Sequence, residues 1–494
     1  MTFVTFPVPV DGLHHLSNET RMIATPWSRM VRGIGLGQHP IAYNPVAAAR
    51  IRHAFALLAA KGAESSAYTR FSRLLAHFVL DVTDPARCLH RRDLEADLGP
   101  ILATVRAEEN PYFRVMAGCV LMDAFAKLGL DRTLLVGADA DFAAETLDVV
   151  DTIEADRIKD ENAGRHGHYE KLSAYTAAFL AIGQLGLGER LVTGPRHYVR
   201  EALALLEKIP APFFRGRGGA MLLSVISLLG HERHIVDDNG RDHIKEVLTH
   251  LDRAGELDNP PAFPQPMSAA FTRVYPLLTM LNAIAMSGRP EEYLSYGRDR
   301  LAEAKDLMAG LRPVERTHMG LYYLVALHNL GRLRDQIPDL DGFVEGIVGE
   351  WRRTDPGANY FLNGISYPYI LQTALLTGRT DLIEPTALDR LVDCFPDLDR
   401  TDDDRVNRPY PFAYALNVLA ELGSAHLLFE PRDSYGGATP ISWVIDRLSD
   451  QGREEPRLYM LNHALVSYAL RLRGPGREAT ALFQEFDFHR GPRG

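Results

Sequence analysis

Residues 165–186 read RHGHYEKLSAYTAAFLAIGQLG, and this stretch contains the pattern that decides the fold. It opens with polar and aromatic residues, continues as an apolar run and ends at Gly186. Apolar residues on all sides of a helix predict that the helix is buried. A glycine at its end is expected because glycine adopts the left-handed conformation that closes a helix. We therefore predict a buried helix whose beginning presents polar side chains.

The same pattern recurs along the chain, where further apolar runs also end at a glycine. The terminating residues are Gly129, Gly186, Gly230, Gly288, Gly331, Gly378, Gly423 and Gly474. Between the apolar runs lie stretches with a polar stripe, at residues 196–209, 241–254 and 291–308. Successive terminating glycines lie 43 to 58 residues apart. A repeat of this length predicts helical hairpins, each pairing a buried helix with a half-exposed one.

These hairpins predict an all-α protein, an α/α toroid (barrel) with inner and outer helix rings. Residues 1–44 lack a sustained period and are expected to form an irregular N-terminal segment. Residues 45–494 are expected to form one toroid domain. An open solenoid is the alternative, but both helices of a solenoid repeat are usually amphipathic. The apolar character of one helix in each hairpin favours the toroid, and the number of hairpins in the ring stays open.

The bulk composition limits the classes of function. The chain has 494 residues, 46% of them hydrophobic and 24% charged, which is typical of soluble globular proteins. The net charge of −10, without a long run of Lys or Arg, argues against a nucleic-acid partner. We expect a cytoplasmic protein with no membrane span, because the sequence shows neither a signal-peptide pattern nor an apolar run of about 18 residues. The 3 widely spaced cysteines indicate a reducing compartment.

The beginnings of the predicted inner helices carry aromatic and ionisable residues. In a toroid the inner helices run in one direction, so their N-terminal ends gather at one rim with the positive ends of their dipoles. The residues at these positions include Tyr112, Arg114, His166, His168, Tyr169, Glu170, Phe214, Arg215, Arg217, Arg273, Tyr275, Thr317, His318, Tyr367, Tyr369, Asp402, Asp403, Asp404, Tyr410, Tyr414 and His463. We interpret them as the lining of a cavity. The alternative is that helix beginnings are exposed and polar in any protein, which explains repeated tyrosines poorly.

Two of these groups suggest acid–base chemistry. His168 and Glu170 lie near one helix beginning, and a histidine beside a carboxylate can act as general acid or base. The histidine spacing does not match HExxH, so no metal site is predicted. Asp402, Asp403 and Asp404 are crowded, which raises the pKa of one carboxyl and keeps its proton available. They also suit Mg²⁺ if the substrate is a diphosphate. A capped, solvated acidic loop is the alternative.

The remaining groups suggest binding. The ring faces of Tyr367, Tyr369, Tyr410 and Tyr414 are suited to stabilising a cation, although a single tyrosine is more often packing. In FFRGRGG, residues 213–219, the glycines permit a close approach of the backbone, and Arg215 and Arg217 can hold an anionic group.

Two stretches resemble the linalool dehydratase/isomerase family, whose members are α/α toroids acting on small isoprenoid alcohols. One is KDEN at 159–162 followed by Gly167, His168 and the apolar helix; the other is Thr401-Asp402-Asp403 before LNVLAELG. The resemblance implies that the family's catalytic histidine falls on His168. The family's paired cysteines would fall near residues 213–223, and this segment has none. Terpenoid cyclases on toroids are a related analogy.

These observations lead to one main hypothesis, a lyase or isomerase of cyclase or dehydratase type that acts on an isoprenoid-like small molecule. Its expected catalytic residues are His168, Glu170, Asp402, Asp403, Asp404 and Tyr369. The expected substrate-binding residues are Tyr112, Tyr169, Arg217, Tyr275, His318, Tyr367, Tyr410, Tyr414 and His463. We expect no cofactor, except Mg²⁺ with a diphosphate substrate, and a homo-oligomer is possible. A polysaccharide or uronate lyase, with Arg217 and Arg273 neutralising a carboxylate, and a non-catalytic helical scaffold are the alternatives.

Overall fold

The computed structural model describes most of the helical part of the chain. The described residues are 41–63, 66–87, 89–137, 140–155, 159–160, 165–253, 268–353, 370–371, 373–374, 377–382, 384–393, 395–396, 412, 415–416, 418–420, 422–448 and 456–473. Their contacts form two compact units. Unit 1 contains Glu154–Ile383, and unit 2 contains Leu36–Ile153 and Glu384–Phe483. The predicted division into residues 1–44 and one domain over 45–494 stays a prediction.

The described chain is all-α, as predicted, apart from strands of two residues each. The elements of unit 1 are β2 (Lys159–Asp160), β3 (Arg165–His166), α8 (Gly167–Gln184), η6 (Gly188–Leu191), α9 (Tyr198–Leu205), η7 (Leu206–Lys208), α10 (Pro212–Leu228), η8 (Glu232–His234), α11 (His243–Asp252), α12 (Ala269–Met286), α13 (Pro290–Tyr293), α14 (Arg300–Ala309), α15 (Pro313–Asn329), α16 (Leu333–Gln336), α17 (Leu340–Arg353) and η9 (Thr380–Leu382). Strands β2 and β3 pair antiparallel immediately before α8.

Unit 2 is built in the same way. Its elements are β1 (Ile41–Ala42), α3 (Pro45–Ala60), α4 (Ala67–Thr83), α5 (Arg91–Arg106), α6 (Pro111–Leu128), η4 (Arg132–Leu134), α7 (Phe142–Asp151), α19 (Pro385–Asp393), η12 (Ala425–Leu428), η13 (Asp433–Tyr435), α21 (Pro440–Leu448), α22 (Pro456–Arg471) and β4 (Leu472–Arg473). Strands β1 and β4 pair in parallel. The beginnings of α4, α6 and α22 meet, because the Tyr68 and Phe113 rings lie 5.8 Å apart and Asn462 donates a 2.9 Å hydrogen bond to Thr69.

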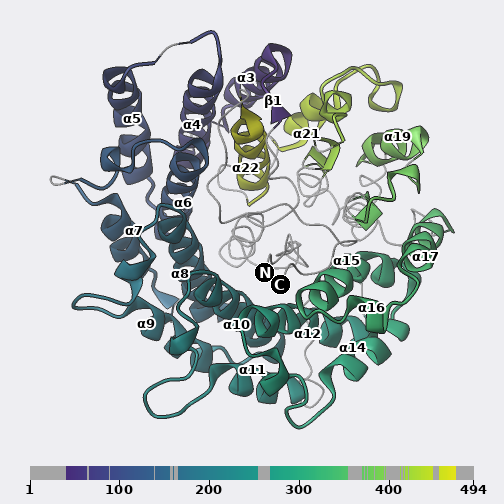
Figure 1. The fold of residues 1–494 in the computed structure, drawn as a ribbon. Coiled ribbons are helices and arrows are strands. Elements are labelled where there is room, and N and C mark those ends of the chain that lie inside the picture. Colours follow the sequence, from purple (N-terminus) through teal and green to yellow (C-terminus); the bar gives the residue numbers. More distant parts are fainter. Residues whose placement is uncertain are drawn as a thin grey trace. The chain divides into compact units, whose positions relative to one another are not determined.

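Within unit 1, helices α8, α10, α12 and α15 form a consecutive inner row, and each also packs on an outer helix, α9, α11, α14 or α17 (Figure 1). The inner helices run parallel. At their beginnings, Phe271 of α12 lies 5.9 Å from the His318 ring of α15. At their ends, Asn329 of α15 donates a hydrogen bond to Asn282 of α12. Helices α10 and α12 are apolar nearly all round because an inner helix covers each of them on both sides and an outer helix covers them from outside.

The predicted helix-terminating glycines are confirmed wherever the structure describes them. All of them have backbone φ angles between 61° and 76°: Gly129, Gly186, Gly230, Gly288, Gly331, Gly378 and Gly423. This left-handed conformation favours glycine because a Cβ atom would collide with the backbone. Gly474 lies outside the described residues.

The predicted boundaries were wrong in two respects. The apolar runs at 219–230 and 319–331 predicted two inner helices, but α10 and α15 begin earlier, at Pro212 and Pro313, because proline fits the first position of a helix. The stretch 291–308, predicted as one outer helix, divides into α13 and α14. Gly297 breaks it with a φ of 68°, and Asp299 caps α14.

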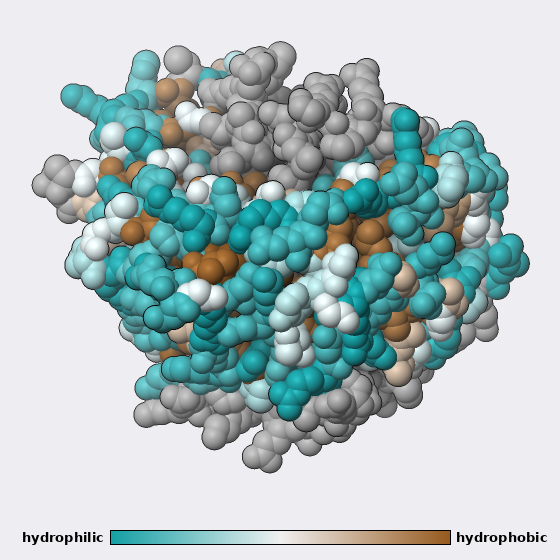
Figure 2. Space-filling model, turned by 60° about the horizontal axis from the view of Figure 1, so that its bottom comes forward, coloured by the Kyte–Doolittle hydropathy of each residue, from teal (hydrophilic) through white to brown (hydrophobic). Residues whose placement is uncertain are grey.

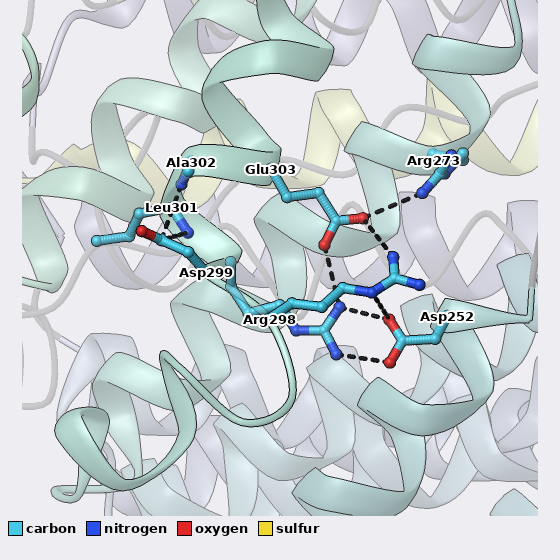
Figure 3. A network of polar contacts seen from close by, with 8 residues as sticks. Asp252, Arg273, Arg298, Asp299, Leu301, Ala302 and Glu303 are labelled. Atoms are coloured by element: carbon cyan, nitrogen blue, oxygen red, sulfur yellow. Dashed lines mark hydrogen bonds and ion pairs between the residues drawn. The ribbon is translucent and has the colours of Figure 1, made fainter.

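A network of charged residues fixes the outer helices α11 and α14 to α12 (Figure 3). The Arg300 guanidinium, with 1% of the residue exposed, donates to both carboxylate oxygens of Asp252 at 2.5 and 2.8 Å and to Glu303 at 3.0 Å. Arg273 of α12 donates to Glu303 at 3.1 Å. The network therefore joins the end of α11 to the beginnings of α12 and α14.

The hydropathy of the surface and of helix α12 indicates whether the protein could span a membrane. Hydrophilic side chains cover most of the coloured surface in Figure 2, with smaller apolar stretches between them. Among the described residues, α12 alone is long and apolar enough to cross a membrane, and 78% of its apolar window is buried. Core helices of soluble proteins have the same property, so α12 is weak evidence for a membrane span.

Candidate functional site

The four inner helices of unit 1 bring four predicted binding residues into one aromatic cluster. We define this cluster by the residues Tyr169, Phe213, Phe214, Arg217, Phe271, Tyr275, His318 and Tyr322. Tyr169 of α8 packs its ring edge against Phe214 of α10, with ring centres 5.3 Å apart. Phe213 lies 5.2 Å from Phe214 and 5.9 Å from Tyr275 of α12. The predicted gathering of these helix beginnings is therefore seen in unit 1.

Glycine permits the close contact between α8 and α10. A Cβ atom on Gly218 would lie 3.0 Å from Leu172 and 3.1 Å from the Tyr169 ring. The glycines of residues 213–219 do permit a close approach, as expected. They lie inside α10, however, where they admit neighbouring side chains.

Arg217 lies among the aromatic rings. Only 1% of this residue is exposed, and its Cζ atom is 4.9 Å from the centre of the Tyr275 ring and 6.0 Å from that of Phe213. A guanidinium stacks favourably on aromatic faces because their π-electrons are attracted to its positive charge. The rings therefore orient the guanidinium at a fixed place in the cluster.

Two tyrosine hydroxyls meet in the same cluster. Tyr275 and Tyr322 of α15 pack edge to face with centres 5.2 Å apart, and their hydroxyl oxygens are 3.5 Å apart. The His318 ring lies one helical turn before Tyr322, 6.1 Å from its ring, and touches Phe271 at 5.9 Å. Two phenols and an imidazole thus adjoin Arg217.

His318 is neutral over the physiological pH range. Burial, followed by the positive charge of Arg217, lowers the pKa of His318 to about 3. A neutral imidazole has one nitrogen that accepts a proton and one that donates a hydrogen bond. His318 is therefore unprotonated, and one of its ring nitrogens can accept a proton.

A buried carboxylate fixes the beginnings of α12 and α15. Glu315 is 0% exposed and accepts hydrogen bonds from the Ser268 backbone and hydroxyl, each at 2.8 Å. It also accepts from the Arg312 backbone at 3.0 Å and from its guanidinium at 2.6 Å. Burial raises the pKa of Glu315, but the bonds from Arg312 and Ser268 outweigh burial and hold it below its usual value. Glu315 thus positions Tyr275 and His318 by joining their helices.

His168 and Glu170 flank Tyr169 in the first turn of α8. The two residues are 8% and 3% exposed. Strands β2 and β3 lead directly into this turn, and α8 begins at Gly167. The predicted acid–base pair is therefore buried on the helix that contributes Tyr169 to the aromatic cluster.

Other predicted helix-beginning arginines face the outer layer. Arg215 donates to the backbone oxygens of Ile209 and Glu207 at 2.8 and 2.6 Å, which satisfies the end of the preceding helix. Arg273 pairs with Glu303, and Arg114 of unit 2 pairs with Glu145 at 3.2 Å. The expectation that Arg215 holds an anionic group was wrong, because neighbouring backbone carbonyls already occupy this guanidinium.

Tyr112 and His463 belong to unit 2. Tyr112, 1% exposed, lies in the first turn of α6, where the Asn110 side chain caps its backbone N–H at 3.0 Å. His463 is 5% exposed and follows Asn462, which bonds Thr69. Tyr112 is buried at the beginning of its helix, as the repeat pattern predicts. His463 is buried in the middle of α22, because this helix begins at Pro456, before the predicted beginning.

Several predicted site residues lie outside the described residues. They are Tyr367, Tyr369, Asp402, Asp403, Asp404, Tyr410 and Tyr414. Their proposed roles in catalysis, in Mg²⁺ binding and in cation stabilisation stay predictions. Within the described ranges, no group of 3 or more His, Cys, Asp or Glu side chains is placed to hold a metal ion.

Comparison with known proteins adds no family. Protein-family models, curated proteins and solved structures were each compared with this chain, and no match was found in any of the three comparisons. The similarity to linalool dehydratase/isomerase therefore rests on the two short stretches alone.

Sequence reasoning missed Glu315 and Phe271 and did not include Tyr322 among the site residues. The signal for Glu315 was present: Pro313 suits the first position of a helix, and a glutamate two residues later suits the third. The predicted helix began at the apolar run 319–331, so the polar first turn of α15, which contains Glu315, was left out.

Proposed function

We propose that the chain is a lyase or isomerase, of dehydratase or cyclase type, acting on an isoprenoid-like small molecule inside an α/α toroid. The observation that carries the proposal is the aromatic cluster. Parallel helices bring tyrosine and phenylalanine rings together with a neutral histidine at one end of an otherwise apolar row. Apolar walls with a few convergent polar groups are typical of small-molecule sites.

The chemistry requires one acid and one base. In a dehydration, the acid gives a proton to the leaving hydroxyl, the C–O bond breaks and water departs. The base then takes a proton from the neighbouring carbon, and the C–H electrons form the double bond. His168 and Glu170 are the proposed pair, because burial favours the protonated form of a carboxyl and the neutral form of an imidazole.

Arg217 decides where positive charge can develop on the substrate. The guanidinium already lies over the Tyr275 ring at 4.9 Å, so a second positive charge there would be repelled. We therefore place any cationic centre of the reaction at the Tyr169 end of the cluster, beside His168 and Glu170.

A uronate lyase is the second candidate, and Arg217 is the observation that favours it. Such an enzyme neutralises a sugar carboxylate and removes the adjacent proton, which suits an arginine beside a neutral histidine and two tyrosines. The second arginine of that hypothesis, Arg273, is paired with Glu303 in the outer layer. Release of an unsaturated uronate, followed by its ultraviolet absorbance, would favour this candidate over the first.

The proposal is tested with purified full-length protein and a panel of isoprenoid alcohols and diphosphates, with and without Mg²⁺. Products are identified by gas chromatography and mass spectrometry. His168→Gln and Glu170→Gln are expected to lower turnover by about 100-fold or more, since general acid–base catalysis contributes about 10²–10⁴-fold. His53→Gln, at an exposed position, is the matched control and should keep full activity. Absence of product from the whole panel would refute the proposal.

The toroid is tested separately by small-angle X-ray scattering. A closed ring of hairpins gives a compact particle, whereas an open solenoid of the same length gives an extended one. An extended particle would remove the enclosed cavity on which the proposed chemistry depends.

A further inference from the structure

Three histidines meet where the outer helix α9 begins, and we call them the histidine junction: His197, His231 and His234. His197 is the N-cap residue of α9, and the other two stand at the ends of η8, which follows α10. The rings of His197 and His234 pack edge to face with centres 4.6 Å apart, and the His231 ring lies 6.2 Å from that of His234. The three side chains are not placed to hold a metal ion. The junction therefore joins the beginning of an outer helix to the segment after the neighbouring inner helix.

Two of these imidazoles are hydrogen-bond acceptors. The Nδ1 atom of His197 accepts from the backbone N–H of Arg200 at 3.2 Å, which caps the first turn of α9. The Nε2 atom of His234 accepts from the guanidinium of Arg233 at 3.2 Å. A neutral imidazole has one unprotonated nitrogen, so in both residues the nitrogen that can take up a proton is the one that accepts the bond. Protonation therefore removes both hydrogen bonds.

His231 makes a different contact. Its Nε2 atom lies 3.0 Å from the backbone oxygen of Gly188 in η6, and a carbonyl oxygen can only accept. His231 is therefore the donor, and only 2% of this residue is exposed. Since a further proton would bind the other ring nitrogen, the bond to Gly188 survives protonation. The link between η6 and η8 thus tolerates acid, whereas the link to α9 does not.

The charges around the junction disfavour protonated histidines. Burial, followed by the charge of Arg200, lowers the pKa of His197, and burial, followed by His197 and Arg233, lowers the pKa of His234. The carboxylate that acts on His197 is Asp238, which is already paired with Arg200 at 2.7 Å. The positive end of the α9 dipole opposes a cation at the N-cap as well. The remaining charged groups on these segments are exposed or have other partners: Glu189, Arg190, Arg196, Glu201, Glu232 and Asp237.

We propose that the histidine junction is a proton-sensitive latch: in mild acid, protonation of His197 and His234 releases the beginning of α9, while His231 keeps η6 and η8 together. The direction follows from the lowered pKa values of the first two histidines. Their contribution to stability is complete above about pH 6.5 and is lost as the pH falls. Helix α9 packs on α8, which carries Tyr169. The latch therefore loosens the outer cover of the inner row in acid, and it does not depend on the proposed function.

The test is hydrogen–deuterium exchange of the full-length protein at about pH 7 and about pH 5, read by mass spectrometry and corrected for the intrinsic pH dependence of amide exchange. Exchange in the first turn of α9 should be about 5- to 30-fold faster in acid, the range expected when a helix loses its cap. Peptides from η6, α10 and α12 should keep their corrected rates, which also establishes that the protein stays folded. An unchanged rate in α9, or an equal rise in all these peptides, would overturn the proposal.

Variants assign the effect to the two imidazoles. His197→Asn keeps an acceptor oxygen at the N-cap but has no site for a proton, so exchange in α9 should no longer depend on pH. His234→Gln should reduce the acid-induced rise without abolishing it. His53→Asn, at an exposed position of unit 2, is the matched control and should show the full rise. If His197→Asn responds to acid as the wild type does, the proposal is wrong; if that variant does not fold by circular dichroism, an unreduced rise in His234→Gln decides against it.

Histidines that merely pack beside a helix are the competing explanation, and nitrogen-15 nuclear magnetic resonance of the imidazoles distinguishes it. The two acceptor roles require opposite tautomers at neutral pH, with the proton on Nε2 in His197 and on Nδ1 in His234. The histidine variants assign the signals. Both rings should become protonated over the same pH interval in which exchange of α9 rises. Rings that stay neutral while α9 opens, or that share one tautomer, would contradict the latch.

Discussion

Replacing His318 by phenylalanine tests whether this histidine is buried in its neutral form. His318 is 0% exposed and packs on the rings of Phe271 and Tyr322. Phenylalanine can occupy a similar volume but cannot bind a proton. Burial, then Arg217, lowers the pKa of His318 in the folded protein to about 3, against about 6.5 in the unfolded chain. The unfolded chain therefore binds more protons than the native state between these values. The histidine's contribution to stability is complete above about pH 6.5 and is lost as the pH falls toward 3.

The expected size of this effect follows from the two pKa values. Between about pH 7 and about pH 5, protonation of His318 in the unfolded chain should lower the free energy of unfolding by about 2 kcal/mol. Other histidines with lowered pKa, such as His77 and His243, add their own losses in the same direction. The informative quantity is therefore the difference between wild type and variant.

The assay is urea unfolding at the two pH values, followed by circular dichroism. The wild type should lose about 2 kcal/mol more than His318→Phe over this interval. His53→Phe, at an exposed position, is the control and should lose as much as the wild type. Arg217→Met provides a second check, because removing one cause of the shift should raise the pKa of His318 and reduce the loss. The reasoning is refuted if His318→Phe has the same pH dependence as the wild type.

Three further predictions, two of them with a control substitution, test the packing that positions the site. Arg300→Met should lower the free energy of unfolding by about 3 kcal/mol, because it leaves Asp252 and Glu303 without their buried partner. Arg298→Met, whose side chain is 42% exposed in the same network, should cost less than about 1 kcal/mol, and equal urea midpoints would contradict this ranking. Gly218→Ala should cost about 1–3 kcal/mol, since its Cβ would lie 3.1 Å from the Tyr169 ring. Gly346→Ala, on the exposed side of α17 with nothing within 4 Å, should gain about 0.5–1 kcal/mol by thermal melting, and a gain at both positions would contradict the packing argument. Glu315→Gln should cost about 1.5–3 kcal/mol at neutral pH and progressively less as acid protonates the native glutamate; hydrogen exchange at the beginning of α12 should rise, and unchanged exchange there would contradict the role of Glu315.

The helical repeat was readable because two independent signals coincide at the same positions. Apolar residues on all sides mark the inner helices, and a glycine that needs positive φ marks each end. Gly186 and Gly331 show both, with φ angles of 73° and 69°. The beginnings of the helices lacked such a signal, since α10 begins with arginines and glycines among its aromatic residues and α15 begins with a polar turn. Pro212 and Pro313 mark the first positions of these helices. The prediction instead placed each helix beginning at the start of the apolar run.

The site was harder to predict because the direction of a side chain depends on the rotational phase of its helix. Arg215 and Arg217 are two residues apart, which rotates them by about 200° around α10. One therefore meets the carbonyls that end the preceding helix, and the other meets Tyr275. Both residues are arginines with nearly the same neighbours in sequence. Residue type therefore could not tell which of them faces the outer helix and which faces the inner rings. The phase is instead fixed by Gly216 and Gly219, whose missing side chains admit Leu251 and Val247 of α11 on the outer side. A pair of glycines three residues apart on a buried helix thus marks the side where another helix approaches closely, and in α10 that mark places Arg217 among the inner rings.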